Sequence, residues 1–126
     1  MFRRIRMLEG SSIDPAIVAE VHRQAANRQP VLVTLDSNHT HEHVLAELQA
    51  YAPLVRAGSY IAVFDTVIED FPAGSFPDRP WDKGNNAKTA VHEFLRRNPR
   101  FEIDRQIEDK IQITVAPDGY LRCIAD

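Results

Sequence analysis

Two short apolar runs that each end on an aspartate constrain the fold of this chain more than any other feature. Residues 31–35 (VLVTL) precede Asp36 and residues 60–64 (YIAVF) precede Asp65, with helix-forming sequence between them. Neither run alternates apolar with polar residues, which is typical of strands covered on both faces in a parallel sheet. We therefore expect residues 31–35 to form a central strand, joined to residues 60–64 by a helix that packs on the sheet.

The rest of the chain also alternates between strand-like and helix-like segments. Residues 5–8 predict a short first strand, and Asp14 followed by Pro15 predicts the capped start of a helix that ends near Asn27. The other expected elements are helices from Thr40 to Gly58 and from Asn86 to Asn98, and a final hairpin of residues 111–115 and 120–124 around a turn at residues 117–119.

This order of elements predicts one α/β domain over residues 1–126, with a mainly parallel sheet, helices on both faces and a C-terminal antiparallel hairpin. Residues 68–84 form a long segment rich in proline and aromatic residues. Long structured loops in compact domains are uncommon and often functional, so this segment is expected to be a lid. We expect Trp81 or Phe76 to face a cleft at the ends of the strands.

Charge, cysteine content and apolar run length exclude several classes of protein. The net charge is −3, and the only basic cluster, Arg3, Arg4 and Arg6, is too short for a nucleic-acid interface. Cys123 is the single cysteine, so an intrachain disulfide is excluded and a reducing compartment is indicated. The apolar runs are too short to span a membrane, and no signal peptide is recognised. We therefore expect a cytoplasmic protein that binds neither nucleic acid nor membranes.

Asp36 and Asp65 are candidate ligands for one divalent cation. Ligands of α/β sheets collect at the carboxyl ends of the strands, and adjacent parallel strands place both aspartates there. Carboxylate oxygens of this kind suit magnesium. His39 follows closely and can act as a general base on a substrate hydroxyl. The alternative interpretation is that the aspartates only tighten turns or face solvent and that His39 caps a turn.

His41 and His43 lie in the first turn of the next predicted helix, where we expect a solvent-exposed polar face. A zinc site formed by His39, His41 and His43 is disfavoured, because residues at this spacing do not converge on one point without distortion. Sequence motifs for esterase, phosphate-loop and thiol chemistry are absent.

Four separated stretches, in order, resemble the cephalosporin hydroxylase and rhamnosyl O-methyltransferase family. They are LDSNHTHEHVLAELQAYAPLV, GSYIAVFDT, the loop FPDRPW…GNN and the helix AVHEFL. The similarity covers nearly all of the chain, as a C-terminal part of the family's domain. It implies a Rossmann-like fold of the S-adenosylmethionine-dependent methyltransferase type that lacks the first strands. It also implies magnesium-assisted O-methylation or a related hydroxylase-family reaction on a small molecule or sugar, with a link to antibiotic biosynthesis and secondary metabolism.

The resemblance also implies roles for individual residues. The family's D-x-x-H motif falls on Asp36 as metal ligand and on His39 as catalytic base, and the second residue of its acidic pair falls on Asp65. The first residue of that pair falls on Phe64, which cannot bind a metal. Glu69 and Asp70 are candidates for a replacement oxygen.

The chain departs from the family at the cofactor site, because it contains no glycine-rich turn for the methionine part of S-adenosylmethionine. Ser11, Ser12 and Asp14 match the segment near the cofactor's adenine, and they can equally be no more than a helix cap. A non-catalytic interaction module is therefore the rival of the enzyme. In that case, an exposed sheet edge would pair with a second copy or with a complementing chain.

Overall fold

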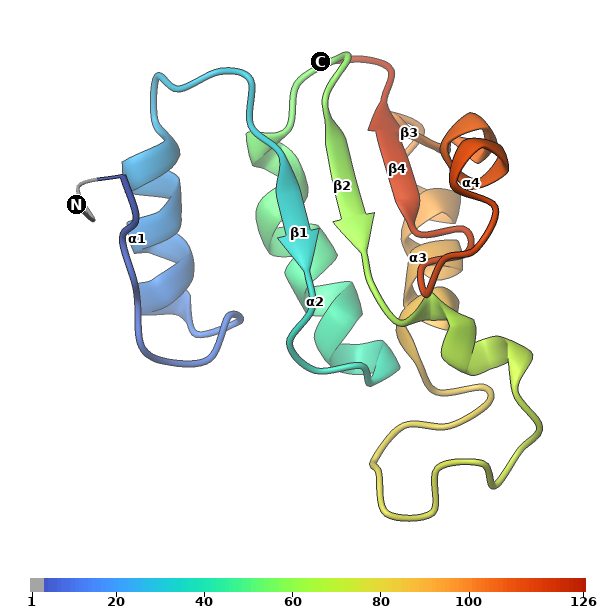
Figure 1. Cartoon of the computed structure of the whole chain (residues 1–126). Helices are drawn as coiled ribbons and strands as arrows, with labels where there is room; N and C mark the ends of the chain where they lie inside the picture. Colours follow the sequence, from blue (N-terminus) through green and yellow to red (C-terminus); the bar gives the residue numbers. More distant parts are fainter. Residues whose placement is uncertain (1–3) are drawn as a thin grey trace.

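Helices and strands alternate along residues 4–126, the part of the chain that the computed structural model describes. Arg3 of the basic cluster lies outside these residues. The α/β class predicted from the sequence is confirmed (Figure 1). In chain order the elements, with η marking a 3₁₀ helix, are α1 (Pro15–Ala25), β1 (Val33–Leu35), α2 (His41–Tyr51), η1 (Ala52–Leu54), β2 (Tyr60–Val63), η2 (Thr66–Asp70), α3 (Ala87–Arg97), β3 (Phe101–Ile103), α4 (Arg105–Ile111) and β4 (Tyr120–Cys123).

The strands form an open mixed sheet in the order β1-β2-β4-β3. β1 runs parallel to β2, with Val33 opposite Ile61, whereas β4 runs antiparallel to both β2 and β3. The expectation that residues 31–35 form a central strand is wrong, because β1 lies at the edge of the sheet. Leu32, just before β1, is 64% exposed, although its run is as apolar as that of β2.

Two predicted strands are not formed. Residues 5–8 adopt irregular structure with Ile5 and Met7 exposed. The expected hairpin partner of β4, residues 111–115, does not form a strand either, because Ile111 ends α4 and residues 112–115 are irregular, with Ile113 91% exposed. β4 pairs instead with β3, whose Phe101 is buried against Phe94 of α3.

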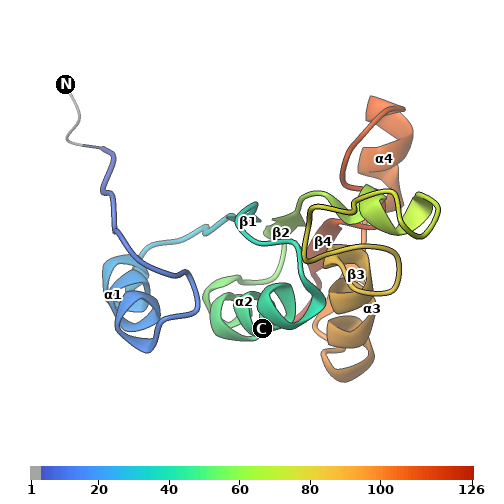
Figure 2. The same cartoon turned by 90° about the horizontal axis from the view of Figure 1, so that it is seen from below.

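The core lies between the sheet and the helices α2 and α3. Figure 2 shows α1, α2 and α3 on one side of the sheet and α4 on the other. The fully buried side chains at the centre of this core include Leu48, Val55, Ile61, Val91, Phe94 and Leu121. Gly119 is required where β4 begins, because a Cβ atom there would lie 2.2 Å from the carbonyl oxygen of Val63.

Side-chain caps explain where two helices begin. The Asp14 carboxylate accepts a hydrogen bond from the backbone N–H of Ala16 at 2.8 Å, as the sequence predicts. Asn86 and Thr89 form a reciprocal capping box at the start of α3. No helix formed by residues 4–126 combines the length and the apolar character needed to cross a membrane.

Candidate metal and acceptor site

The parallel pairing of β1 and β2 brings three predicted site residues together. Asp36 and His39 follow β1, Asp65 follows β2, and one ligand atom from each lies within 4.8 Å of the other two. His39 Nε2 is 3.0 Å from Asp65 Oδ2. Each carboxylate has a second oxygen, so this contact leaves Asp65 able to ligate an ion. Asp36 is exposed, whereas the His39 side chain is only 13% exposed.

The donor chemistry of this cluster fits a small divalent cation. Two ligands on opposite sides of Mg²⁺ are about 4.2 Å apart, which is near the spacing of these three groups. Carboxylate oxygens are the ligands that magnesium prefers, and the ion commonly keeps several waters. The arrangement therefore suits a magnesium ion that Asp36 and Asp65 bind together, either directly or through water.

Asp65 adopts a left-handed backbone conformation, with φ 57° and ψ 24°. This conformation is uncommon for residues other than glycine, and aspartate and asparagine tolerate it best. It occurs at the turn between β2 and η2, and the backbone conformation of this turn sets the direction of the Asp65 side chain. Backbone strain of this type concentrates at functional sites.

The predicted lid covers this cluster from one side. Its first residues belong to η2, and the remainder extends beyond the ends of β1 and β2 (Figure 1). The Trp81 ring meets the His39 ring edge-on, with centroids 4.9 Å apart, and the Arg79 guanidinium lies 5.4 Å from the Trp81 centroid. A cavity of about 560 Å³ is lined by His39, Asp65, Phe71, Phe76, Arg79 and Trp81. Both aromatic residues predicted to face the cleft therefore line it.

Glu69 and Asp70 hold the base of the lid and do not join the cluster. Glu69 Oε2 accepts hydrogen bonds from the Gly84 N–H at 2.7 Å and from Asn86 Nδ2 at 2.5 Å. Burial raises the pKa of Glu69, but these hydrogen bonds and the nearby lysines together hold that pKa below its usual value. Asp70 pairs with Lys88 Nζ at 2.7 Å. Neither carboxylate belongs to the group of potential metal ligands formed by Asp36, His39 and Asp65.

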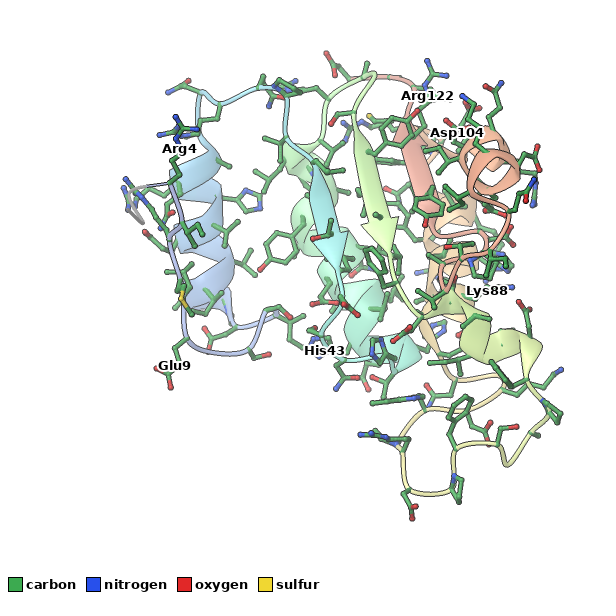
Figure 3. The ribbon with its side chains drawn as sticks, in the orientation of Figure 1. Arg4, Glu9, His43, Lys88, Asp104 and Arg122 are labelled. Atoms are coloured by element: carbon green, nitrogen blue, oxygen red, sulfur yellow. The ribbon has the colours of Figure 1, made fainter. Side chains whose placement is uncertain are left out.

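A second polar cluster lies on the other side of the β1–α2 turn. Glu47 of α2 is 2% exposed, and its Oε1 accepts hydrogen bonds from the hydroxyls of Ser12 and Ser37 at 2.5 Å and 2.8 Å. His43 Nε2 lies 3.0 Å from the hydroxyl oxygen of Ser12. Figure 3 shows the His43 side chain at the start of α2, beside the loop that precedes α1. Asp36, Ser12, Ser37 and Glu47 border one cavity of about 470 Å³.

The three predicted cofactor-binding residues are placed differently. Ser12 borders the 470 Å³ cavity, and its carbonyl oxygen accepts a hydrogen bond from the Tyr51 hydroxyl. The Asp14 carboxylate caps α1, and Ser11 is exposed, with its carbonyl oxygen bonded to the Asp14 N–H. The structure therefore brings Ser12, but neither Ser11 nor Asp14, to the cavity wall.

The expectation that His41 and His43 occupy a solvent-exposed face is wrong. The His41 ring lies 2.8 Å from Thr89 Oγ1 and 3.1 Å from Glu93 Oε2, so it links α2 to α3. The His43 side chain is 16% exposed and links α2 to the loop before α1. The sequence offered one signal for the buried cluster, because Glu47 lies four residues after His43, on the same helix face.

Comparison with known proteins identifies the family. The family model described as rhamnosyl O-methyltransferase/CmcI matches residues 1–124. Curated relatives named rhamnosyl O-methyltransferase, from Mycobacterium bovis and Mycobacterium tuberculosis, are 33% identical over 121 residues. A relative of the same name from Mycobacterium leprae is 31% identical over 121 residues. No solved structure matches the chain significantly.

These matches cover 93% of this chain but only 46% to 49% of the relatives. The chain therefore spans about half the length of the curated relatives it matches. The family predicted from the separated motifs is confirmed by the family model and by these relatives. This chain belongs to the rhamnosyl O-methyltransferase/CmcI family.

Proposed function

We propose that this chain forms the metal-binding and acceptor-binding part of an S-adenosylmethionine-dependent, magnesium-assisted O-methyltransferase that acts on a sugar hydroxyl. The observation that carries the proposal is the convergence of Asp36, His39 and Asp65 beside an aromatic-lined cavity. The family and the name of the mycobacterial relatives support methyl transfer to a rhamnosyl group.

Asp36 and Asp65 would hold magnesium between the ends of β1 and β2, and His39 would act as the general base. When bound, magnesium supplies positive charge that positions the acceptor oxygen, and S-adenosylmethionine supplies the methyl group. His39 Nε2 lies 3.0 Å from Asp65 Oδ2, so Asp65 would accept the Nε2–H hydrogen bond, orient the ring and stabilise the imidazolium, while Nδ1 would take the proton from the acceptor hydroxyl. Positioning of the two reactants supplies much of the rate enhancement.

The lid would form the acceptor side of this site. Phe71, Phe76 and Trp81 offer flat apolar surfaces, and Arg79 offers hydrogen-bond donors at the same cavity. Closure of such a loop excludes water from the reacting groups. The cavity at Ser12, which Asp36 also borders, would lie on the cofactor side.

The proposed reaction is tested by completing this chain with the remaining part of the Mycobacterium tuberculosis relative and supplying S-adenosylmethionine, Mg²⁺ and a methyl rhamnoside. Mass spectrometry then measures the methylated sugar and S-adenosylhomocysteine. His39→Ala should lower turnover by about 10²- to 10⁴-fold, the usual contribution of a general base. Asp109→Asn, a change on the exposed face of α4, is the matched control. Turnover that survives both His39→Ala and chelation of Mg²⁺ would contradict the proposal.

A further inference from the structure

Arg79 is the only permanently charged cation among those of residues 4–126 that line the lid cavity of about 560 Å³. The same cavity presents the His39 ring, the Asp65 carboxylate and the aromatic rings of the lid. A guanidinium carries five N–H donors in a fixed fork, and this fork matches the oxygens of a carboxylate or a phosphate. The position of Arg79 therefore bears on the kind of acceptor that the cavity takes.

The guanidinium of Arg79 has no acidic partner in the described part of the chain. No salt bridge within residues 4–126 includes Arg79 or Asp78, the residue before it. The guanidinium lies instead against the Trp81 ring, with its central carbon 5.4 Å from the ring centroid. A cation–π contact of this kind keeps the charge at the cavity wall but supplies no acceptor oxygen for the N–H donors.

Other carboxylates of the lid are already used within the lid and at its base. Asp82 accepts hydrogen bonds from the backbone N–H groups of Gly74 and Lys83, at 2.6 Å and 2.7 Å. Glu69 and Asp70 hold the base of the lid. These three groups are therefore committed to the structure of the lid and are not counter-ions for a guanidinium in the cavity.

The charges of the site favour an acceptor that carries a negative group. In the proposed function, on which this inference rests, Asp36 and Asp65 together balance one divalent cation, so Arg79 leaves one positive charge without a counter-ion. Closing the lid over a neutral acceptor would take this charge out of water unpaired, which costs free energy. A carboxylate or phosphate on the acceptor would supply both the counter-ion and the oxygens for the fork.

We propose that Arg79 selects an acceptor that carries a carboxylate or a phosphate next to the sugar ring that is methylated. The guanidinium donates hydrogen bonds to two oxygens of this group, while Phe76 and Trp81 contact the ring. Arg79 is then a specificity-determining residue with no part in proton transfer. The name of the mycobacterial relatives specifies a rhamnosyl group and leaves the charge of the neighbouring group open.

Trp81 is the single tryptophan of the chain, so its fluorescence reports binding at this cavity directly. The 126-residue chain is titrated, with and without Mg²⁺, with two matched pairs of ligands: methyl glucuronoside against methyl glucoside, and rhamnose 1-phosphate against methyl rhamnoside. The anionic member of at least one pair should bind at least about tenfold more tightly, and the pair that shows this preference identifies the group as a carboxylate or a phosphate.

Three variants test whether Arg79 causes this preference. Arg79 is exposed, so its variants should stay folded. Arg79→Gln should remove the preference for the anionic ligand, and Arg79→Lys, which keeps the charge but loses the fork, should keep only part of it. Arg96→Gln, which removes an exposed charge from α3, is the matched control and should keep all of it.

A preference that persists in Arg79→Gln would overturn the proposal, and its dependence on Mg²⁺ would then assign the anion to the metal. Equal affinity for both members of each pair, or no fluorescence change with any of the four ligands, would also overturn it. The titration requires no methyl transfer. Loss of the reaction with an intact preference for the anion would therefore contradict the proposed function alone.

Discussion

His39 Nε2 lies 3.0 Å from Asp65 Oδ2, so the turn after β1 is joined directly to the end of β2. The two residues are distant in the chain and meet only because β1 and β2 are parallel neighbours. The contact places an imidazole and a carboxylate at the mouth of the aromatic cavity. The same pairing brings a ligand atom of Asp36 within 4.8 Å of those of His39 and Asp65, so one feature of topology assembles the candidate site.

Trp81 should control the mobility of the lid. Trp81→Ala removes the edge-on contact with His39 and the cation–π contact with Arg79, which together are worth about 1–2 kcal/mol. Limited proteolysis should then cut within residues 71–82 several-fold faster, with little change in global unfolding. Trp81→Phe keeps an aromatic ring and is the control. Cleavage rates that are equal in Trp81→Ala, Trp81→Phe and the unchanged chain would show that the lid is not held by this contact.

Glu47 should be a major contributor to stability. Its Oε1 accepts from Ser12 and Ser37, and its Oε2 is buried without a hydrogen-bond partner in residues 4–126. Glu47→Ala leaves two hydroxyls without their acceptor and opens a cavity, so it should lower the free energy of unfolding by about 2–3 kcal/mol. Urea denaturation measures this loss. Gln49→Ala, an exposed change on the same helix, should stay within about 0.5 kcal/mol.

The sequence predicted the proximity of Asp36, His39 and Asp65 better than it predicted the sheet. Asp36, His39 and Asp65 were found because strand ends are marked by an abrupt change from apolar to polar residues. The edge position of β1 was missed because its run is as apolar as that of a covered strand, and the pattern does not report which side lacks a neighbour. Residues 111–115 were wrongly predicted as a strand for a related reason, since their apolar residues alternate although Ile111 ends α4 and residues 112–115 are irregular and largely exposed. β3 was missed because three residues carry almost no periodicity.

The buried cluster at Glu47 was missed because its members come from three separate segments. Ser12 precedes α1, Ser37 follows β1, and His43 and Glu47 lie on α2. Only the last two share a local spacing. A carboxylate inside a helix is normally read as solvent-facing, and its burial depends on contacts with Ser12 and Ser37 that only the tertiary fold creates.

Acid should weaken the attachment of the lid at Glu69. The folded-state pKa of this group is depressed below 4.5, so its contribution is fully present above that value and is lost as pH falls through the folded-state pKa. Urea unfolding of the unchanged chain and of Glu69→Gln should therefore differ most near neutral pH, and the difference should shrink below about pH 4.5. A difference that is constant between neutral and acid pH would refute this assignment.

The 126 residues alone should bind S-adenosylmethionine weakly or not at all. The sequence contains no glycine-rich turn, and of the three candidate cofactor residues only Ser12 borders the cavity. Each missing charge-assisted hydrogen bond removes about 1.5–3 kcal/mol, and each 1.4 kcal/mol is about tenfold in affinity. Calorimetric titration should show no micromolar binding and no methyl transfer by the isolated chain. Micromolar affinity would show that these residues already form a cofactor pocket.

Calorimetric titration with Mn²⁺, used as a stand-in for Mg²⁺, tests most directly whether Asp36 and Asp65 hold one cation beside His39. We predict binding of one ion per chain, weakened at least about tenfold by Asp36→Asn and by Asp65→Asn, since each removes one charged ligand. Asn is tolerated in the left-handed conformation at position 65, so that variant should stay folded. Asp109→Asn should leave the affinity unchanged. Absence of binding, or equal affinity in all four proteins, would contradict the metal site on which the proposed reaction depends.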